Sequence, residues 1–344
     1  MTQTRTPPGV VPGVLNLRVG ELVEVRSAEE ILATLDERGE LENLPFMPEM
    51  LAYCGQRLSV HKVAHKVCDT LNRTGMRKMS GAVHLTGARC SGEEHGGCQT
   101  ACSLYWKEQW LRRVAPDDPP AGTTGLVNGH SKGIADGRAL LPLLVTNARK
   151  PDGPDGDERF SCQATELLRA APVCLSFLDV SQYVRDVRSG NVGPVSVFRT
   201  FLVGLFNRLQ RRATKVLPRK LWFREGLRWR FLKGGVTGRT PTAHLDLRPG
   251  ELVRIRSKED IVATLDENLL NRGMGFDEEM SSYCGQTYRV QSRVERCIDE
   301  KTGRMLTMKS PCIVLDGVVC RGVYNSSCPR EFVPFWREIW LERV

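Results

Sequence analysis

Several common features are missing from this chain of 344 residues. It contains no run of about 18 apolar residues, the length needed for a transmembrane helix. Its first residues, MTQTRTPPGVVPGV, lack the charged-then-apolar order of a secretory signal. We therefore expect a cytoplasmic protein without a transmembrane segment.

Two familiar motifs are missing as well. The sequence has no phosphate-binding glycine-rich loop and no H-E-x-x-H. These patterns place a phosphate or a zinc ion in the common nucleotide-binding proteins and metalloproteases. The sequence therefore gives no support to those classes.

Acidic residues are almost absent from one segment. Residues 199–239 contain twelve lysines and arginines but only one acidic residue, Glu225. The net charge of the whole chain is +9. Aromatic residues stand among these cations, including Trp222 and Trp229. The candidate anion-binding residues are Arg211, Arg212, Lys215, Arg219, Lys220, Arg228 and Arg230.

This basic segment has several interpretations. Cations hold phosphates while aromatic rings stack on bases, which would suit a nucleic acid. An amphipathic cationic helix with Trp and Phe also suits a membrane surface, and the stretch VSVFRTFLVGLFNRLQRRATKVL predicts a helix of about six turns. A protein partner, a small anionic ligand or a solvated basic face would also fit.

The sequence repeats itself at a constant offset of 230 residues. Residues 15–37 and 245–267 share 16 of 23 positions, YCGQ recurs at Tyr53 and Tyr283, and YWKEQWLRRV recurs as FWREIWLERV. Such identity far exceeds chance. It predicts one module of about 100 residues, duplicated and paired.

The module pattern is typical of small β-domains. GELVEVRS, QRLSVHKVAHKVC and GAVHLTGARC alternate as strands do. Ser27 with Glu30 predicts a capped helix from Ala28 to Asp36, and Ser257 with Asp260 repeats the signal. We predict a mainly β fold with some α: two SH3-like β-barrel modules, 15–114 and 245–344, joined by a mixed, partly helical insert, 115–244.

The closing tryptophans of each module are spaced by four residues, Trp106 with Trp110 and Trp336 with Trp340. Large aromatic side chains of this kind either fill a core or form an exposed platform for ligands. The core interpretation is the ordinary one.

Ten of the twelve cysteines lie in the two modules, and four in each follow the repeat. Four per module suit a tetrahedral zinc site, with iron as the alternative metal, although paired C-x-x-C motifs are missing. Buried or disulfide-paired cysteines without metal would give the same pattern. The predicted ligands are Cys54, Cys68, Cys90 and Cys98 in the first module, and Cys284, Cys297, Cys320 and Cys328 in the second.

The first module has additional ligand-type residues. His95 and Cys102 lie close to Cys90 and Cys98 in the sequence, whereas the second module has Asn325 and Phe332 at the aligned positions. A metal site with an open coordination position, or a thiolate beside an imidazole, would make His95 and Cys102 catalytic candidates. Ordinary drift of surface residues would also explain the difference.

Two functions follow from these patterns. In the first, the protein is a metal-stabilised adaptor or binding scaffold that meets a protein partner or an anionic ligand through the basic insert. In the second, it is an enzyme acting on a small molecule, with its active site at Cys90, His95, Cys98 and Cys102.

Overall fold

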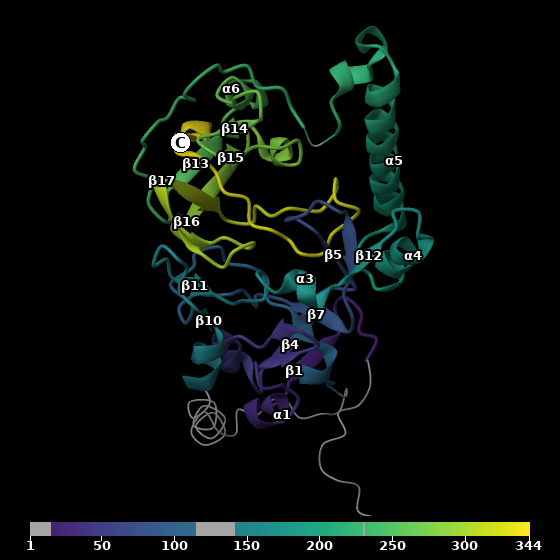
Figure 1. The fold of residues 1–344 in the computed structure, drawn as a ribbon, viewed down its shortest axis with the longest axis vertical. Coiled ribbons are helices and arrows are strands. Elements are labelled where there is room, and N and C mark those ends of the chain that lie inside the picture. Colours follow the sequence, from purple (N-terminus) through teal and green to yellow (C-terminus); the bar gives the residue numbers. More distant parts are fainter. Residues whose placement is uncertain (1–14, 115–141, 230) are drawn as a thin grey trace, which may run out of the picture. The chain divides into compact units, whose positions relative to one another are not determined.

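The computed structural model describes residues 15–114, 142–229 and 231–344. The chain forms two compact units (Figure 1). The first contains the described residues up to Leu175, together with Val184–Asn191 and Ile298–Met305; the second contains the remainder. Both are mixed α/β, with many antiparallel strands in small sheets, and the insert contributes residues to both.

The main sheet of the first unit has the strand order β8-β7-β4-β1-β9. Every pairing between these neighbours is antiparallel. The strands are β1 (Leu22–Val25), β4 (Arg57–Val63), β7 (Ala82–Leu85), β8 (Trp106–Lys107) and β9 (Leu111–Arg113). The alternating stretches thus form strands as predicted.

The first helix confirms its predicted start. In α1 (Ala28–Leu32), the Ser27 hydroxyl accepts a hydrogen bond from the Glu30 amide, and the Glu30 carboxylate accepts one from the Ser27 amide. The predicted end at Asp36 is wrong. The Asp36 carboxylate accepts the amides of Arg38 and Glu40, which folds this residue into a turn after the helix.

Smaller elements complete the first unit, and they include a helix over residues 142–147. The insert strand β12 pairs with β6 of the first module in the sheet order β12-β6-β5. The remaining elements are β2 (Glu40–Leu41), β3 (Leu44–Pro45), η1 (Pro48–Tyr53), β5 (Lys66–Cys68), β6 (Met76–Lys78), η2 (Glu108–Trp110), β10 (Arg149–Lys150), β11 (Arg159–Phe160), α3 (Leu167–Ala170) and β12 (Val173–Leu175).

The second unit contains the sheet β17-β16-β13-β18. Its register matches the first unit at the offset of 230, since Val23 faces Leu58 and Val253 faces Tyr288. Its elements are β13 (Leu252–Ile255), α6 (Lys258–Val262), β14 (Leu270–Asn271), β15 (Met274–Gly275), η5 (Met280–Tyr283), β16 (Thr287–Ile298), β17 (Met305–Leu315), η6 (Glu338–Trp340) and β18 (Leu341–Arg343). The tips of β16 and β17 belong to the first unit.

The tryptophans form the cores. Trp106, Trp110, Trp336 and Trp340 are each 0% exposed, and the indole nitrogens of Trp110 and Trp340 donate to Thr34 and Thr264 respectively. The core interpretation is therefore confirmed, and the exposed-platform alternative is wrong. The closing segments are short strands and 3₁₀ turns.

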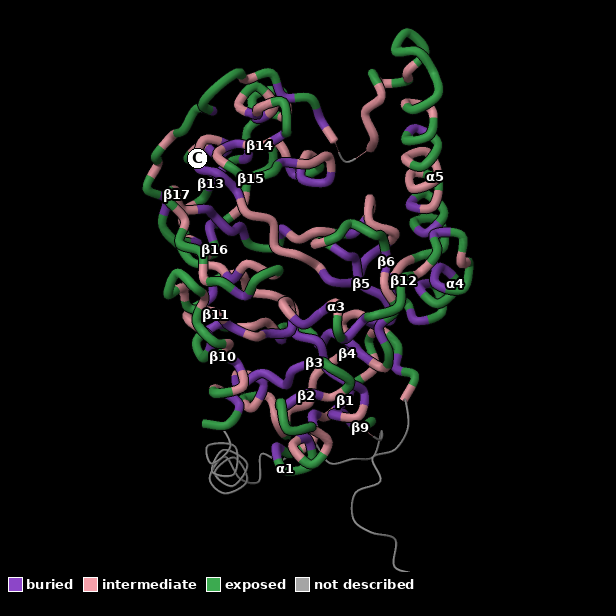
Figure 2. The backbone as a smooth tube through the Cα atoms, in the orientation of Figure 1, coloured by how far each residue is buried: buried purple, intermediate pink, exposed green. Residues whose placement is uncertain are grey.

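The predicted basic helix is present as α5 (Pro194–Val216), preceded by α4 (Val180–Arg188) and followed by the turns η3 (Arg219–Leu221) and η4 (Phe223–Gly226). Pro194 opens α5, as suits a position whose amide needs no helical partner. The Phe177 ring stacks on Phe201 at a centroid distance of 5.0 Å. Beyond that contact, α5 is mostly exposed or half-buried along its length (Figure 2).

Candidate metal centre

One group of ligand-type side chains lies in the first unit. Glu49, Cys90 and His95 place one ligand atom each within 4.8 Å of one another. The Cys90 sulfur lies 3.0 Å from Glu49 Oε1 and 3.4 Å from His95 Nε2. His95 Nδ1 lies 3.4 Å from the same carboxylate oxygen. Among the described residues, it is the one such group of three or more.

Local folding explains why His95 returns to Cys90. Glu49 stands in η1, and Cys90 follows the turn after β7. The loop between Cys90 and Cys98 bends at Gly92, whose carbonyl accepts the amides of His95 and Gly97. Gly92 has φ +72°, and a Cβ there would lie 1.9 Å from the Cys98 carbonyl oxygen. Only glycine fits this position.

The cluster is buried and incompletely hydrogen-bonded. His95 is 1% exposed, and the Glu49 side chain is 8% exposed. Within the described part of the chain, Glu49 Oε2 and His95 Nδ1 have no hydrogen-bond partner. Buried polar atoms are normally satisfied, because an unmade hydrogen bond is costly. A cation bound at this cluster would pair with the buried carboxylate and the buried imidazole.

The electrostatics of the cluster suit a cation as well. Burial, and then the charge of Glu49, raises the pKa of the Cys90 thiol far above its ordinary value. Burial lowers the pKa of His95, although Glu49 and Glu94 oppose this. The metal-free cluster therefore holds a protonated thiol, which is a poor nucleophile. A divalent cation would favour the thiolate and the neutral imidazole.

Two more cysteines lie close to the cluster. Cys102 and Cys162 both add to the causes that raise the pKa of the Cys90 thiol. The Cys90 amide also donates a hydrogen bond to the Cys102 carbonyl at 2.9 Å. Cys162, from the insert, is 8% exposed in the core of the first unit. Neither sulfur belongs to the group of ligand atoms that lie within 4.8 Å of one another.

The predicted four-cysteine sets do not gather into such groups. All twelve cysteines lie in the described ranges, and Cys90 is the one cysteine in the cluster of three. Burial raises the pKa of Cys54 and of Cys284 to about 11. Cys68 ends β5, and Cys297 lies within β16.

Cys98 and Cys328 are both buried. The Cys98 sulfur lies 3.2 Å from the Thr100 hydroxyl and accepts the Ile298 amide at 3.4 Å. The charge of Cys328 adds to the burial that raises the pKa of the Cys320 thiol. The structure thus brings Cys90 and His95 together, places Cys102 nearby, and leaves the other predicted ligands outside the group.

The second module keeps half of this arrangement. Glu279 and Cys320 stand 230 residues after Glu49 and Cys90, and burial, then the charge of Glu279, raises the pKa of the Cys320 thiol. Asn325 replaces the imidazole, and an amide is a weak ligand for zinc or iron. Glu49 was not among the predicted ligands. Its recurrence as Glu279 was the available signal, although acids shared by both copies are also common as ordinary surface residues.

Other histidines of the first module have structural surroundings. His84 Nδ1 lies 3.0 Å from the Leu104 carbonyl, and its ring lies 4.3 Å from that of Tyr105. His65 Nε2 lies 3.3 Å from Asp186. Neither belongs to the cluster.

The basic segment folds back along α5. The Asn207 side chain accepts from the Trp229 amide at 2.8 Å, and the Arg224 guanidinium lies 3.9 Å from the Trp229 ring centroid. One face of Trp229 is thus occupied. Of the predicted anion-binding residues, Arg211, Arg212, Lys215, Arg219 and Lys220 are exposed, Arg228 is half-buried, and Arg230 lies outside the described residues.

Apolar residues share the surface of α5 with these cations. Val195, Phe198, Leu202, Leu209 and Val216 are spaced by three, four or seven residues and are all exposed, so they form one stripe along the helix. No acidic residue occurs from Pro194 to Leu221. We call this surface the α5 stripe.

Comparison with protein-family models, with curated proteins and with solved structures gave no match to the chain. No helix in the described ranges is long and apolar enough to cross a membrane.

Proposed function

We propose that this protein is a non-catalytic binding scaffold whose first module is stabilised by a metal ion at Glu49, Cys90 and His95. The burial of this cluster carries the proposal. A catalytic metal keeps an open position for substrate, whereas a structural one is enclosed by its ligands and the core. Zinc is the preferred ion, because thiolate, imidazole and carboxylate are its usual ligands, with iron as the alternative.

The repeat supports a scaffold rather than two active sites. We interpret the modules as duplicated SH3-like barrels, on the sequence identity and on the equivalent strand registers at an offset of 230. The second module has lost the imidazole but keeps the Trp336 and Trp340 core. Two similar modules, of which only the first has a metal-type cluster among the described residues, suit a pair of binding domains. In this pair the first module would be stabilised by its metal ion.

The binding surface in this proposal is the α5 stripe, and the partner is a membrane surface with anionic headgroups. The exposed arginines and lysines would attract anionic headgroups, while Phe198 and Leu202 would enter the acyl boundary. A nucleic acid would use the cations but gain little from aliphatic side chains, since base stacking requires aromatic rings.

Metal content of matched variants tests the proposal. We expect the purified chain to hold one metal ion, by mass spectrometry, and Cys90→Ser to lose it. The control is Cys320→Ser in the second module, where Asn325 stands in place of histidine. Metal retained by Cys90→Ser, or lost equally by Cys320→Ser, would contradict the assignment.

The enzyme remains the second candidate, because the Cys90–His95 contact and Cys102 occur in the first module alone. Replacing His95 by Asn and Cys102 by Phe copies the second module. Wild type and double variant would be incubated with a metabolite extract and compared by mass spectrometry. A compound consumed only by the wild type would favour the enzyme; identical profiles would favour the scaffold.

A further inference from the structure

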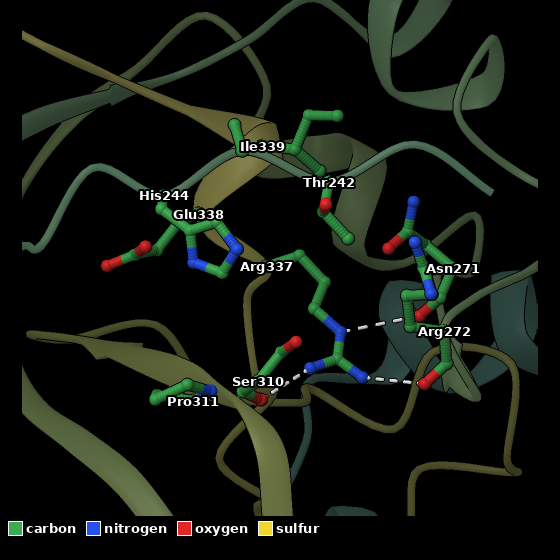
Figure 3. A pocket seen from close by; sticks show the side chains of 10 residues that line it. Thr242, His244, Asn271, Arg272, Ser310, Pro311, Arg337, Glu338 and Ile339 are labelled. Carbon is green, nitrogen blue, oxygen red and sulfur yellow. Dashed lines mark hydrogen bonds between the residues drawn. The ribbon is translucent and has the colours of Figure 1, made fainter.

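A recess in the second unit contains an unusual arginine. The recess is open to solvent and is lined by residues that include His244, Asn271, Arg272, Ser310 and Arg337 (Figure 3). Arg337 is 9% exposed. A guanidinium so far removed from water normally requires a charged partner.

Neutral carbonyl groups hold Arg337 instead. Its Nε donates to the Asn271 carbonyl at 3.3 Å, Nη1 to that of Ser310 at 2.8 Å, and Nη2 to that of Arg272 at 2.8 Å. A weaker contact joins Nη1 to the Cys312 sulfur at 3.4 Å. The guanidinium is thereby fixed in orientation, and one of its five N–H groups is left over.

No carboxylate of the described residues neutralises Arg337. Glu338 lines the same recess, but its carboxylate accepts the amides of Leu245 and Leu247 and pairs with Arg293 at 3.2 Å. The Arg272 Nε donates a hydrogen bond to the Thr240 carbonyl at 2.8 Å. Two arginines therefore line one recess, with the single acid engaged elsewhere.

The first module shows what the missing partner would be. At the position of Arg337 it has Lys107, whose ammonium donates to the Ser80 carbonyl, the counterpart of Ser310. Lys107 also pairs with Glu42 at 2.6 Å. The residue at the Glu42 position in the second module is Arg272. The anionic partner of the first module is thus replaced by a second cation.

We propose that this recess binds an oxyanion, the phosphate or carboxylate group of a small molecule, between Arg337 and Arg272. The anion would take the place that the Glu42 carboxylate occupies in the first module. The one N–H group of Arg337 that is left over can donate to an oxygen of either group, and the positive charge of Arg272 would add to the attraction. The binding is independent of the metal cluster, which lies in the other module.

Titration of the wild type at constant ionic strength tests the proposal. Inorganic phosphate, methyl phosphate and acetate are added separately, and the ¹⁵Nε resonance of Arg337 is followed by NMR. We expect a saturable shift with at least one of the three, and the tighter ligand identifies the class. If none shifts this resonance, or if chloride does so equally, the proposal fails.

Two matched variants locate the site. Arg272→Glu restores the charge arrangement of the first module, so we expect a folded protein whose anion affinity falls at least tenfold. Arg248→Glu makes the same charge change at an exposed position outside the recess and should bind as the wild type does. Equal affinity in Arg272→Glu, or an equal loss in Arg248→Glu, would overturn the assignment. Should Arg272→Glu not fold, Arg272→Gln replaces it under the same criteria.

Discussion

The ammonium of Lys66 lies 2.5 Å from Asp186 Oδ2, and both side chains are 0% exposed. This pair joins β5 of the first module to the end of α4. His65 lies 3.3 Å from the other carboxylate oxygen. Just after α4, the Asn191 side chain accepts the Val63 amide and donates to the Val63 carbonyl. These contacts fasten part of the insert to the first module.

Removing one partner of this pair should destabilise the protein strongly. Asp186→Leu removes the carboxylate that pairs with the buried Lys66 ammonium, and we expect a loss of about 3 to 5 kcal/mol in the free energy of unfolding. Adding Lys66→Met should recover most of that loss, because the buried ammonium is then removed together with its carboxylate partner. Urea unfolding of the two single variants and the double variant measures the coupling. Additive losses would show that the pair does not act as a unit.

The turn at Gly92 makes a sharper prediction about the metal cluster. Gly92→Ala places a Cβ 1.9 Å from the Cys98 carbonyl oxygen, so the loop that returns His95 to Cys90 must shift. Gly87 has a similar φ of +76°, but nothing lies within 4 Å of its added Cβ. We expect Gly92→Ala to lose metal and Gly87→Ala to keep it, with a backbone cost of about 1 to 2 kcal/mol at both positions. Equal metal content in the two variants would show that the conformation of this loop does not determine metal binding.

Much of this architecture is visible in the sequence, for reasons that are local. Ser27 and Glu30 define the start of α1 because a capping box needs only neighbouring residues. The length of α5 follows from its apolar spacing and from Pro194 at its start. These features depend little on tertiary context.

The candidate site was less predictable because it depends on long-range packing. Glu49 reaches Cys90 across 41 residues, and Cys162 approaches from the insert. Counting cysteines favoured a set of four sulfurs, whereas the gathered group contains one sulfur, one imidazole and one carboxylate. Likewise, the contrast between Arg272 and Glu42 acquires meaning only when Arg337 and Lys107 are placed beside them.

Stability at low pH should depend on Glu166. Burial opposes its ionisation, but Lys150 and Arg169 outweigh this and lower the pKa of Glu166 from 4.5 to about 2. A lowered carboxyl pKa contributes stability that is present above pH 4.5 and is lost as the pH falls towards 2. Because both cations are partly exposed, we expect a contribution of about 1 to 2 kcal/mol at neutral pH.

Glu166→Gln should therefore unfold more easily at pH 7, while its stability should change less than that of the wild type between pH 4.5 and pH 2. Thermal unfolding across this range measures the difference. Glu158→Gln removes an exposed ion pair with Arg149 and should cost less than about 0.5 kcal/mol. Parallel acid profiles for wild type and Glu166→Gln would contradict the assigned cause.

The α5 stripe gives the most direct test of the proposed partner. Leu202→Glu places a charge where an acyl chain would lie, and a buried leucine contributes about 1.5 to 3 kcal/mol, so binding to anionic vesicles should weaken at least tenfold. Leu306→Glu makes the same change at an exposed position on β17 and should bind as the wild type does. Flotation with phosphatidylserine-containing vesicles, and with phosphatidylcholine alone, measures both.

Salt dependence then separates lipid from nucleic acid. On vesicles, part of the affinity should persist at high salt, because the apolar contribution of Phe198 and Leu202 is not screened. Binding to single-stranded RNA through the same cations would fall steeply with salt and would be indifferent to Leu202→Ala, which removes apolar surface without adding a charge. Tight, salt-sensitive RNA binding without vesicle binding would assign the basic surface to a nucleic acid, and the membrane proposal would be wrong.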